Sequence, residues 1–228
     1  THIFTAGCKM NIKRLKLMYG IVCIGVLQGL QAYAASRYWV GNNSNKNWNT
    51  TANWSATSGG AAGASVQGDS DSVYFNSGGV GQVILDINIT VLKLTMESSY
   101  TDTIKQNGKA ITTTVNGMLL NGGTFLGSTG NIVVSGHLII AGTNFISTSS
   151  VLTISRDYYF TSGSFIHNNG TVRFSGAATQ NTRIISGSTN FYDLLLSPSA
   201  NIVYLFNTAS IFNVSHALYL SGSYQIRI

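Results

Sequence analysis

Residues 131–174 read NIVVSGHLIIAGTNFISTSS, VLTISRDYYFTSGSFIHNNG and TVRF, which are two copies of a 20-residue pattern and the start of a third. Within each copy, apolar and polar residues alternate in short runs, as in β-strands with one buried face. Rows of twenty from residue 131 onward align the apolar positions in three columns: Ile132, Leu152, Val172, Tyr192 and Phe212; Val134, Ile154, Phe174, Leu194 and Val214; Phe145, Phe165, Ile185 and Leu205.

A period of this length with several short strands is typical of one coil of a β-solenoid and too short for a propeller blade. We therefore predict an all-β fold, a right-handed parallel β-helix (β-solenoid) with about 20 residues per coil and an N-terminal cap. Coils stacked about 4.8 Å apart place Phe145 above Phe165 inside the solenoid. An antiparallel sandwich is the alternative, but its strands vary in spacing, whereas these columns keep their register.

The N-terminal segment has the features of a bacterial export signal. Residues 1–9 precede Met10 and are interpreted as upstream read-through; basic residues and an apolar stretch over 17–30 follow. Ala32 and Ala34 supply the small residues that signal peptidase requires. We predict a signal peptide over 10–34 that is cleaved after Ala34, and a secreted or cell-surface protein. A signal anchor is the alternative.

Removal of that segment changes the composition. The full sequence has 13 basic and 7 acidic residues, a net charge of +6 and 2 cysteines. The part from 35 to 228 keeps nine basic and seven acidic residues and no cysteine, and Ser, Thr and Asn make up 68 of its 194 residues. It has no block of like charge that would favour nucleic acid, and no stretch long and apolar enough to span a membrane.

An irregular, Trp-rich segment precedes the repeat. Residues 35–80 are predicted as the N-terminal cap and first strands, and residues 81–228 as the solenoid coils. The segment contains Tyr38-Trp39-Val40-Gly41, Asn47-Trp48, Asn53-Trp54-Ser55 and Asp71-Ser72-Val73-Tyr74-Phe75. It resembles the start of secreted β-helix repeat proteins of Bacteroidetes-type bacteria, and the later repeats resemble passenger regions of autotransporters and adhesins. The resemblance implies a secreted or cell-surface β-helix protein and brings no catalytic residues with it.

Three tryptophans are candidate binding residues. Trp39, Trp48 and Trp54 are the only tryptophans of the sequence, and all of them belong to this short segment. They either form an aromatic platform for sugar rings or close the first coil, where strand edges and apolar core would otherwise be open.

A second candidate is an exposed apolar stripe. Ile139, Tyr159 and Tyr219 occupy the outward position of three apolar runs and are expected to lie along one face. Exposed apolar stripes often mark contact sites. Cover from a loop or lateral packing is the alternative.

Groups for catalysis or metal binding are sparse. His137 and Asp157 occupy one column in adjacent coils, and such a pair can act as a general base, but no nucleophile accompanies it. Arg173 and Asp193 are expected to form an ion pair across coils. No two acidic residues share a column in the regular coils, and the histidines fall in different columns. We therefore assign no catalytic residue, no metal and no cofactor.

Two functions fit these features. The first is a structural or adhesive role for a secreted repeat protein that contacts carbohydrate, other cells or matrix. The second is the N-terminal part of a polysaccharide-degrading β-helix enzyme, a lyase or glycoside hydrolase, whose carboxylates lie outside this stretch. Because Ile228 falls short of the end of a coil, we expect the chain to continue in a longer protein.

Overall fold

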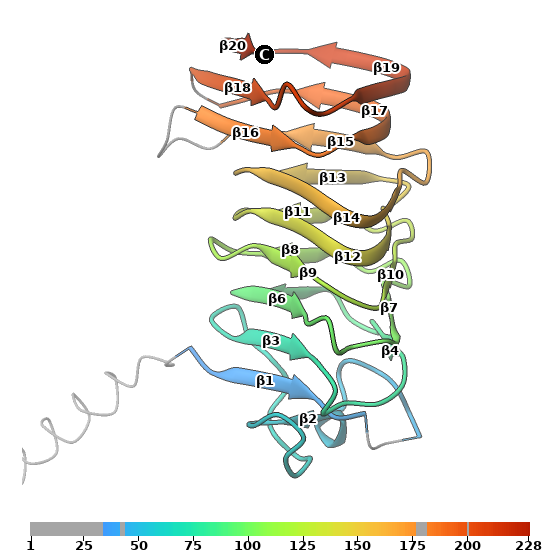
Figure 1. The fold of residues 1–228 in the computed structure, drawn as a ribbon. Coiled ribbons are helices and arrows are strands. Elements are labelled where there is room, and N and C mark those ends of the chain that lie inside the picture. The colour runs from blue at the N-terminus through green and yellow to red at the C-terminus, as the bar shows by residue number, and fades with distance from the viewer. Residues whose placement is uncertain (1–33, 42–43, 177–181, 200) are drawn as a thin grey trace, which may run out of the picture. The chain divides into compact units, whose positions relative to one another are not determined.

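In the part of the chain that the structure describes, parallel strands are stacked in successive coils (Figure 1). The computed structural model describes residues 34–41, 44–176, 182–199 and 201–228, so the predicted signal peptide lies outside the described residues apart from Ala34. Residues from Ala34 onward form one compact unit. Its coils make about 7 turns of roughly 21 residues each. The predicted all-β solenoid is confirmed.

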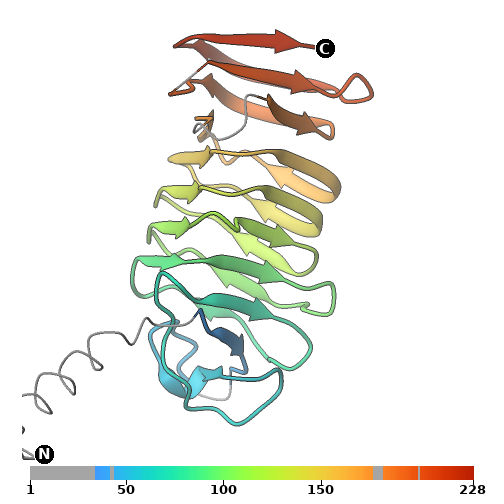
Figure 2. The ribbon, with the colours of Figure 1, turned by 90° about the vertical axis from the view of Figure 1, so that its left-hand side faces the viewer.

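Two sheets run along the stack (Figures 1 and 2). In sheet A the main path is β2 (Trp54–Ser55), β1 (Ser36–Trp39), β3 (Ser72–Phe75), β6 (Lys93–Met96), β9 (Met118–Leu120), β12 (Leu138–Ile146), β14 (Tyr158–Ile166), β16 (Thr182–Ser186), β18 (Ile202–Phe206) and β20 (Tyr224–Arg227), with β4 (Val83–Ile84), β7 (Thr103–Lys105) and β10 (Thr124–Leu126) beside it. Sheet B contains β5 (Ile89–Val91), β8 (Ile111–Thr113), β11 (Ile132–Val134), β13 (Val151–Ile154), β15 (Thr171–Phe174), β17 (Thr189–Leu196) and β19 (Phe212–Leu220). A short 3-10 helix spans Thr51–Asn53.

The first part of the predicted register is confirmed. Ile132 pairs with Leu152, and Leu152 pairs with Val172, so each of these steps up sheet B equals the period read from the sequence. The strand pairs of the described residues are parallel except that of β1 with β2. Because side chains alternate across a strand, this pairing places each buried apolar residue directly above its counterpart in the previous coil.

Beyond Phe174 the predicted columns are wrong. Val172 pairs with Leu194 rather than Tyr192, and Leu194 pairs with Leu218 rather than Val214. The cause lies in the connection between β14 and β16, where Tyr158 pairs with Ile185, a longer step than the repeat predicts. The steps between later paired strands are also longer than 20 residues. Rows of twenty residues therefore no longer place residues that pair in the structure in the same column.

An aromatic ladder runs through the interior on the side of β10, β12 and β14. Phe125 stacks on Phe145, and Phe145 on Phe165, with ring centroids 5.1 and 5.6 Å apart. Phe191 continues the ladder at 5.9 Å from Phe165, and Phe212 follows it. The stack of Phe145 on Phe165 agrees with the prediction, but Ile185 and Leu205 do not continue it, since they belong to β16 and β18.

The three tryptophans are buried in the first coil. Trp54 makes edge-to-face contacts with Trp39 and Trp48, with centroids 5.2 and 4.8 Å away, and all three rings lie near Phe75. The indole N–H of Trp54 donates to the carbonyl of Trp48 (2.7 Å). None of the three residues is more than 1% exposed. This burial leaves no ring face for a sugar, and it favours the alternative in which the tryptophans close the end of the core.

We predict that Trp48→Ala lowers the free energy of unfolding by about 3–5 kcal/mol, because it opens a cavity among aromatic rings. Thermal and urea denaturation followed by circular dichroism measure this effect. Val115→Ala, at a position that is 54% exposed, is the control and should change stability by less than about 0.5 kcal/mol. An unchanged melting temperature for Trp48→Ala would argue against a role in closing the core.

Candidate functional site

One column of outward side chains runs up sheet A. Register partners place Tyr38, Tyr74, Thr95, Leu119, Ile139 and Tyr159 one above another over six strands. They point away from the core because the neighbouring column, which includes Val73, Leu94 and Leu138, is fully buried. We call these six residues the outer column. Thr95, its smallest member, is only 4% exposed.

Aromatic rings lie at both ends of the outer column. The rings of Tyr38 and Tyr74 stack with centroids 5.0 Å apart and an interplanar angle of 19°. At the other end Tyr159 follows Ile139, and both side chains are half-buried. A half-buried aromatic or aliphatic surface of this kind offers flat contact area to a ligand.

A second outward column lies beside the first and contains a gap. Backbone hydrogen bonds align Lys93, Gly117, His137 and Asp157 at the points where successive strands of sheet A begin. Gly117 has φ +69°, and a Cβ atom there would lie 2.1 Å from the carbonyl oxygen of His137. A larger residue does not fit at this position. The column therefore lacks a side chain between Lys93 and His137.

A groove of about 500 Å³ lies at this place. It is lined by Ser72, Tyr74, Lys93, Val115, Asn116, His137 and Arg156. These residues come from β3, from β6 and from the turns that precede β9, β12 and β14, whose strands are stacked in Figure 1. Among the described residues lining the groove, Lys93 and Arg156 are cations and none is a carboxylate. The groove is therefore electropositive.

Asp157 lies at the edge of the groove and is only 8% exposed. Its Oδ2 is 3.2 Å from Nδ1 of His137, so the predicted neighbours do meet. Its Oδ1 accepts a hydrogen bond from the amide of Ile184 (2.9 Å), and Oδ2 accepts one from the Tyr159 hydroxyl (3.4 Å). Asp157 thus links β14 to β16 and orients Tyr159.

The pKa values of two groups near Asp157 are shifted by their own burial and by the charge of Asp157. Burial, together with the charge of Asp157, raises the pKa of Tyr159. Burial lowers the pKa of Arg183, which is 2% exposed, and Asp157 opposes that effect. Arg183 also donates to the carbonyl of Ser155 (3.1 Å). The structural role of Asp157 therefore rests on its hydrogen bonds with the Ile184 amide and the Tyr159 hydroxyl, and its charge also favours the charged form of Arg183.

Several other carboxylates are engaged by backbone amides. Asp71 accepts from the amides of Ala35 and Gly68, Asp86 from that of Asn49, and Asp102 from that of Gly81. Within the part of the chain that the structure describes, no group of three His, Cys, Asp or Glu side chains could hold a metal ion.

The prediction of an ion pair between Arg173 and Asp193 is wrong. Because the register has shifted, Asp193 lies above Thr171. Arg173 instead donates to the hydroxyl of Ser197 (2.7 Å), and Asp193 contacts Nδ1 of His216 at 2.7 Å.

The predicted stripe divides between two sheets. Ile139 and Tyr159 pair directly in sheet A, as expected. Tyr219 is 50% exposed but pairs with Leu195 in sheet B, so it does not extend the stripe. The stripe continues the other way, through Leu119 to Tyr74. The alternation of buried and outward residues around Tyr74 was the signal for this extension, but the irregular spacing of residues 35–110 concealed its register.

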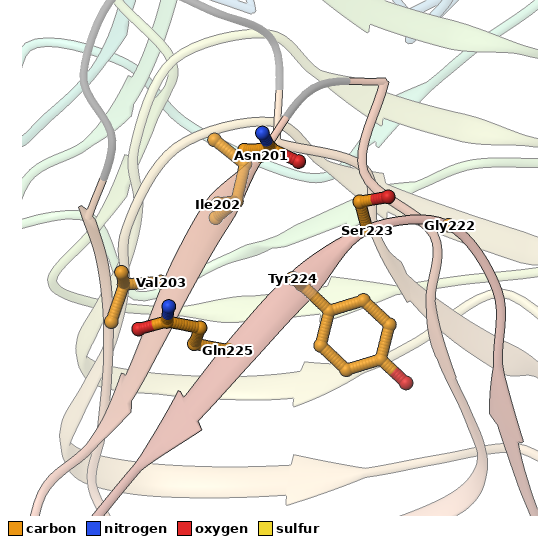
Figure 3. Close-up of a pocket in the computed structure, with 7 residues that line it drawn as sticks. All are labelled: Asn201, Ile202, Val203, Gly222, Ser223, Tyr224 and Gln225. Carbon is orange, nitrogen blue, oxygen red and sulfur yellow. The ribbon is translucent and has the colours of Figure 1, made fainter.

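A larger depression of about 720 Å³ lies at the last coil, between β18 and β20 (Figure 3). It is lined by Asn201, Ile202, Val203, Gly222, Ser223, Tyr224 and Gln225. Figure 3 shows these residues on two neighbouring strands and on the segments that lead into them. This lining contains no charged residue, so it could hold a ligand only through neutral hydrogen bonds and apolar contact.

Comparisons with known proteins give no relative. No family model matches the chain, and no curated protein matches it. No solved structure matches its fold. Among the residues that the structure describes, no helix is long and apolar enough to cross a membrane.

We predict that Asp157→Ala lowers the free energy of unfolding by about 2 kcal/mol, because the buried Ile184 amide and the Tyr159 hydroxyl lose their acceptor. Urea denaturation measures the loss. Asp69→Ala removes an exposed carboxylate and should cost less than about 0.5 kcal/mol. Equal stability of the two variants would contradict the structural role assigned to Asp157.

Proposed function

We propose that this chain is an exported β-solenoid with a structural and adhesive role at the cell surface or in the medium, and that it contacts carbohydrate through the outer face of sheet A. The observation that carries the proposal is the outer column, which keeps Tyr74, Leu119, Ile139 and Tyr159 in line over successive coils. A shallow surface that crosses several strands suits an extended polymer better than a small molecule.

Two features support export. Residues 10–34 have the charged, apolar and small-residue regions of a signal peptide. The compact unit begins at Ala34, next to the expected cleavage point.

The export proposal predicts the N-terminus of the mature protein. Expression of the full sequence in a Gram-negative host should yield exported protein that begins at Ala35, as measured by N-terminal sequencing. Ala34→Leu should block processing, because signal peptidase needs a small residue at this position. The exposed Ala56→Leu is the control. Recovery of uncleaved protein in the membrane fraction would favour the signal-anchor alternative.

The chemistry of the outer face supports carbohydrate as the ligand. Tyrosine rings present an apolar face and a polar hydroxyl, and sugars likewise combine apolar ring faces with hydroxyl groups. Ser72 and Asn116 add neutral hydrogen-bonding groups to the groove beside Tyr74. Such surfaces bind through several modest contacts, which fits an adhesive role.

We predict that Tyr74→Ala and Tyr159→Ser each weaken binding to a polysaccharide by about tenfold, as expected for loss of one aromatic contact. Tyr219→Ser removes an exposed tyrosine from sheet B and should bind as the wild type does. Glycan arrays followed by titration calorimetry provide the measurement, with melting temperatures to verify folding.

The same polysaccharides test the enzymatic alternative. Incubation with purified protein should leave their chain lengths unchanged. Clear depolymerisation would support a lyase or glycosidase instead and would overturn the adhesive proposal. Equal binding by all three tyrosine variants would place the contact surface elsewhere.

A further inference from the structure

We infer that the groove at Lys93 selects an acidic saccharide, one that carries carboxylate or sulfate groups. The inference rests on the proposed contact with carbohydrate and adds the charge of the ligand. It follows from three observations on the groove, which are the position of its cations, the absence of competing anions among its described lining residues and the adjacent aromatic ring.

The two cations of the groove lie in different coils, with the gap at Gly117 between them. Lys93 begins β6, and Arg156 lies in the turn before β14, three strands further along sheet A. Strands are spaced about 4.8 Å apart, so the two backbone positions are separated by roughly 14 Å. A ligand along the groove therefore meets two cations at separate points, which suits a chain with repeated acidic groups.

The groove's cations have no internal counter-ion. Among the described residues, neither Lys93 nor Arg156 forms an ion pair, and the two pairs of a basic side chain with a carboxylate are His137 with Asp157 and His216 with Asp193. Asp157 is the nearest acid in the sequence to Arg156, but it is buried and holds the Ile184 amide. The positive charge is thus available to a bound anion.

The aromatic ring distinguishes a saccharide from a simple anion. Tyr74 lines the groove next to Lys93, and its ring stacks on that of Tyr38. A ring held by stacking offers a fixed face, which a sugar ring can cover while its acidic group reaches a cation. Inorganic phosphate or sulfate would use only the cations.

The experiment compares a uronic-acid oligosaccharide with its own methyl ester, which has the same backbone and no charge. We expect the purified protein to bind the acid at least tenfold more tightly than the ester, because charge-assisted hydrogen bonds are lost with the ester. Lys93→Gln and Arg156→Gln should each weaken binding of the acid by about tenfold and leave binding of the ester unchanged. Calorimetry at low and high ionic strength should show that the affinity of the wild type for the acid falls with salt. The variant that combines Lys93→Gln and Arg156→Gln should lack this salt dependence.

Lys109→Gln is the matched control, because it removes one positive charge from a loop outside the groove. It should bind the acid as the wild type does, and Lys93→Arg should retain most of the affinity. Melting temperatures establish that all variants fold.

Each outcome decides the matter. Equal affinity for acid and ester, or equal weakening by Lys93→Gln and Lys109→Gln, would overturn the acidic-ligand inference. The proposed carbohydrate contact would then survive if Tyr74→Ala still weakened binding of the ester. Binding of inorganic sulfate or single-stranded DNA as tightly as the oligosaccharide would also overturn the inference. If neither oligosaccharide binds, both the acidic-ligand inference and the proposed contact of carbohydrate with Tyr74 at the groove are overturned.

Discussion

The backbone hydrogen bonds between successive coils are the interaction on which the rest of the structure depends. They hold neighbouring strands about 4.8 Å apart and in parallel register. A side chain is therefore packed chiefly against its counterparts one coil below and one coil above. Phe145 between Phe125 and Phe165 is the clearest example inside the solenoid. The same spacing aligns Ile139 with Tyr159 on the outside.

This constraint links the candidate site to the core. Gly117 is required because the chain turns with positive φ against the backbone of His137 in the next coil. The close approach that keeps the coils in register thus removes a side chain from the surface. Lys93 and His137 remain on either side of the gap. The groove is a consequence of stacking rather than a separate element added to the fold.

The features that depend on a constant period could be predicted from the sequence. The solenoid fold, the stack of Phe145 on Phe165 and the meeting of His137 with Asp157 all follow from equal steps between coils. Tyr219 could not be placed, because the step from β14 to β16 is longer than the repeat and nothing in the local pattern shows this change of spacing. The groove was missed for a related reason, since steps before residue 110 are also irregular and Lys93 lies among them.

The scarcity of acidic residues connects composition with the character of the surface. Of 7 acidic side chains in the sequence, four accept backbone amide hydrogen bonds in turns or between strands, namely Asp71, Asp86, Asp102 and Asp157. A carboxylate held in this way stabilises the fold, and its charge is directed toward the backbone. Lys93 and Arg156, by contrast, extend from the first residue of a strand and from a turn into a groove whose described lining has no carboxylate. A nearly neutral solenoid can therefore present a local positive site, because these carboxylates hold the coils together and the two cations of the groove do not.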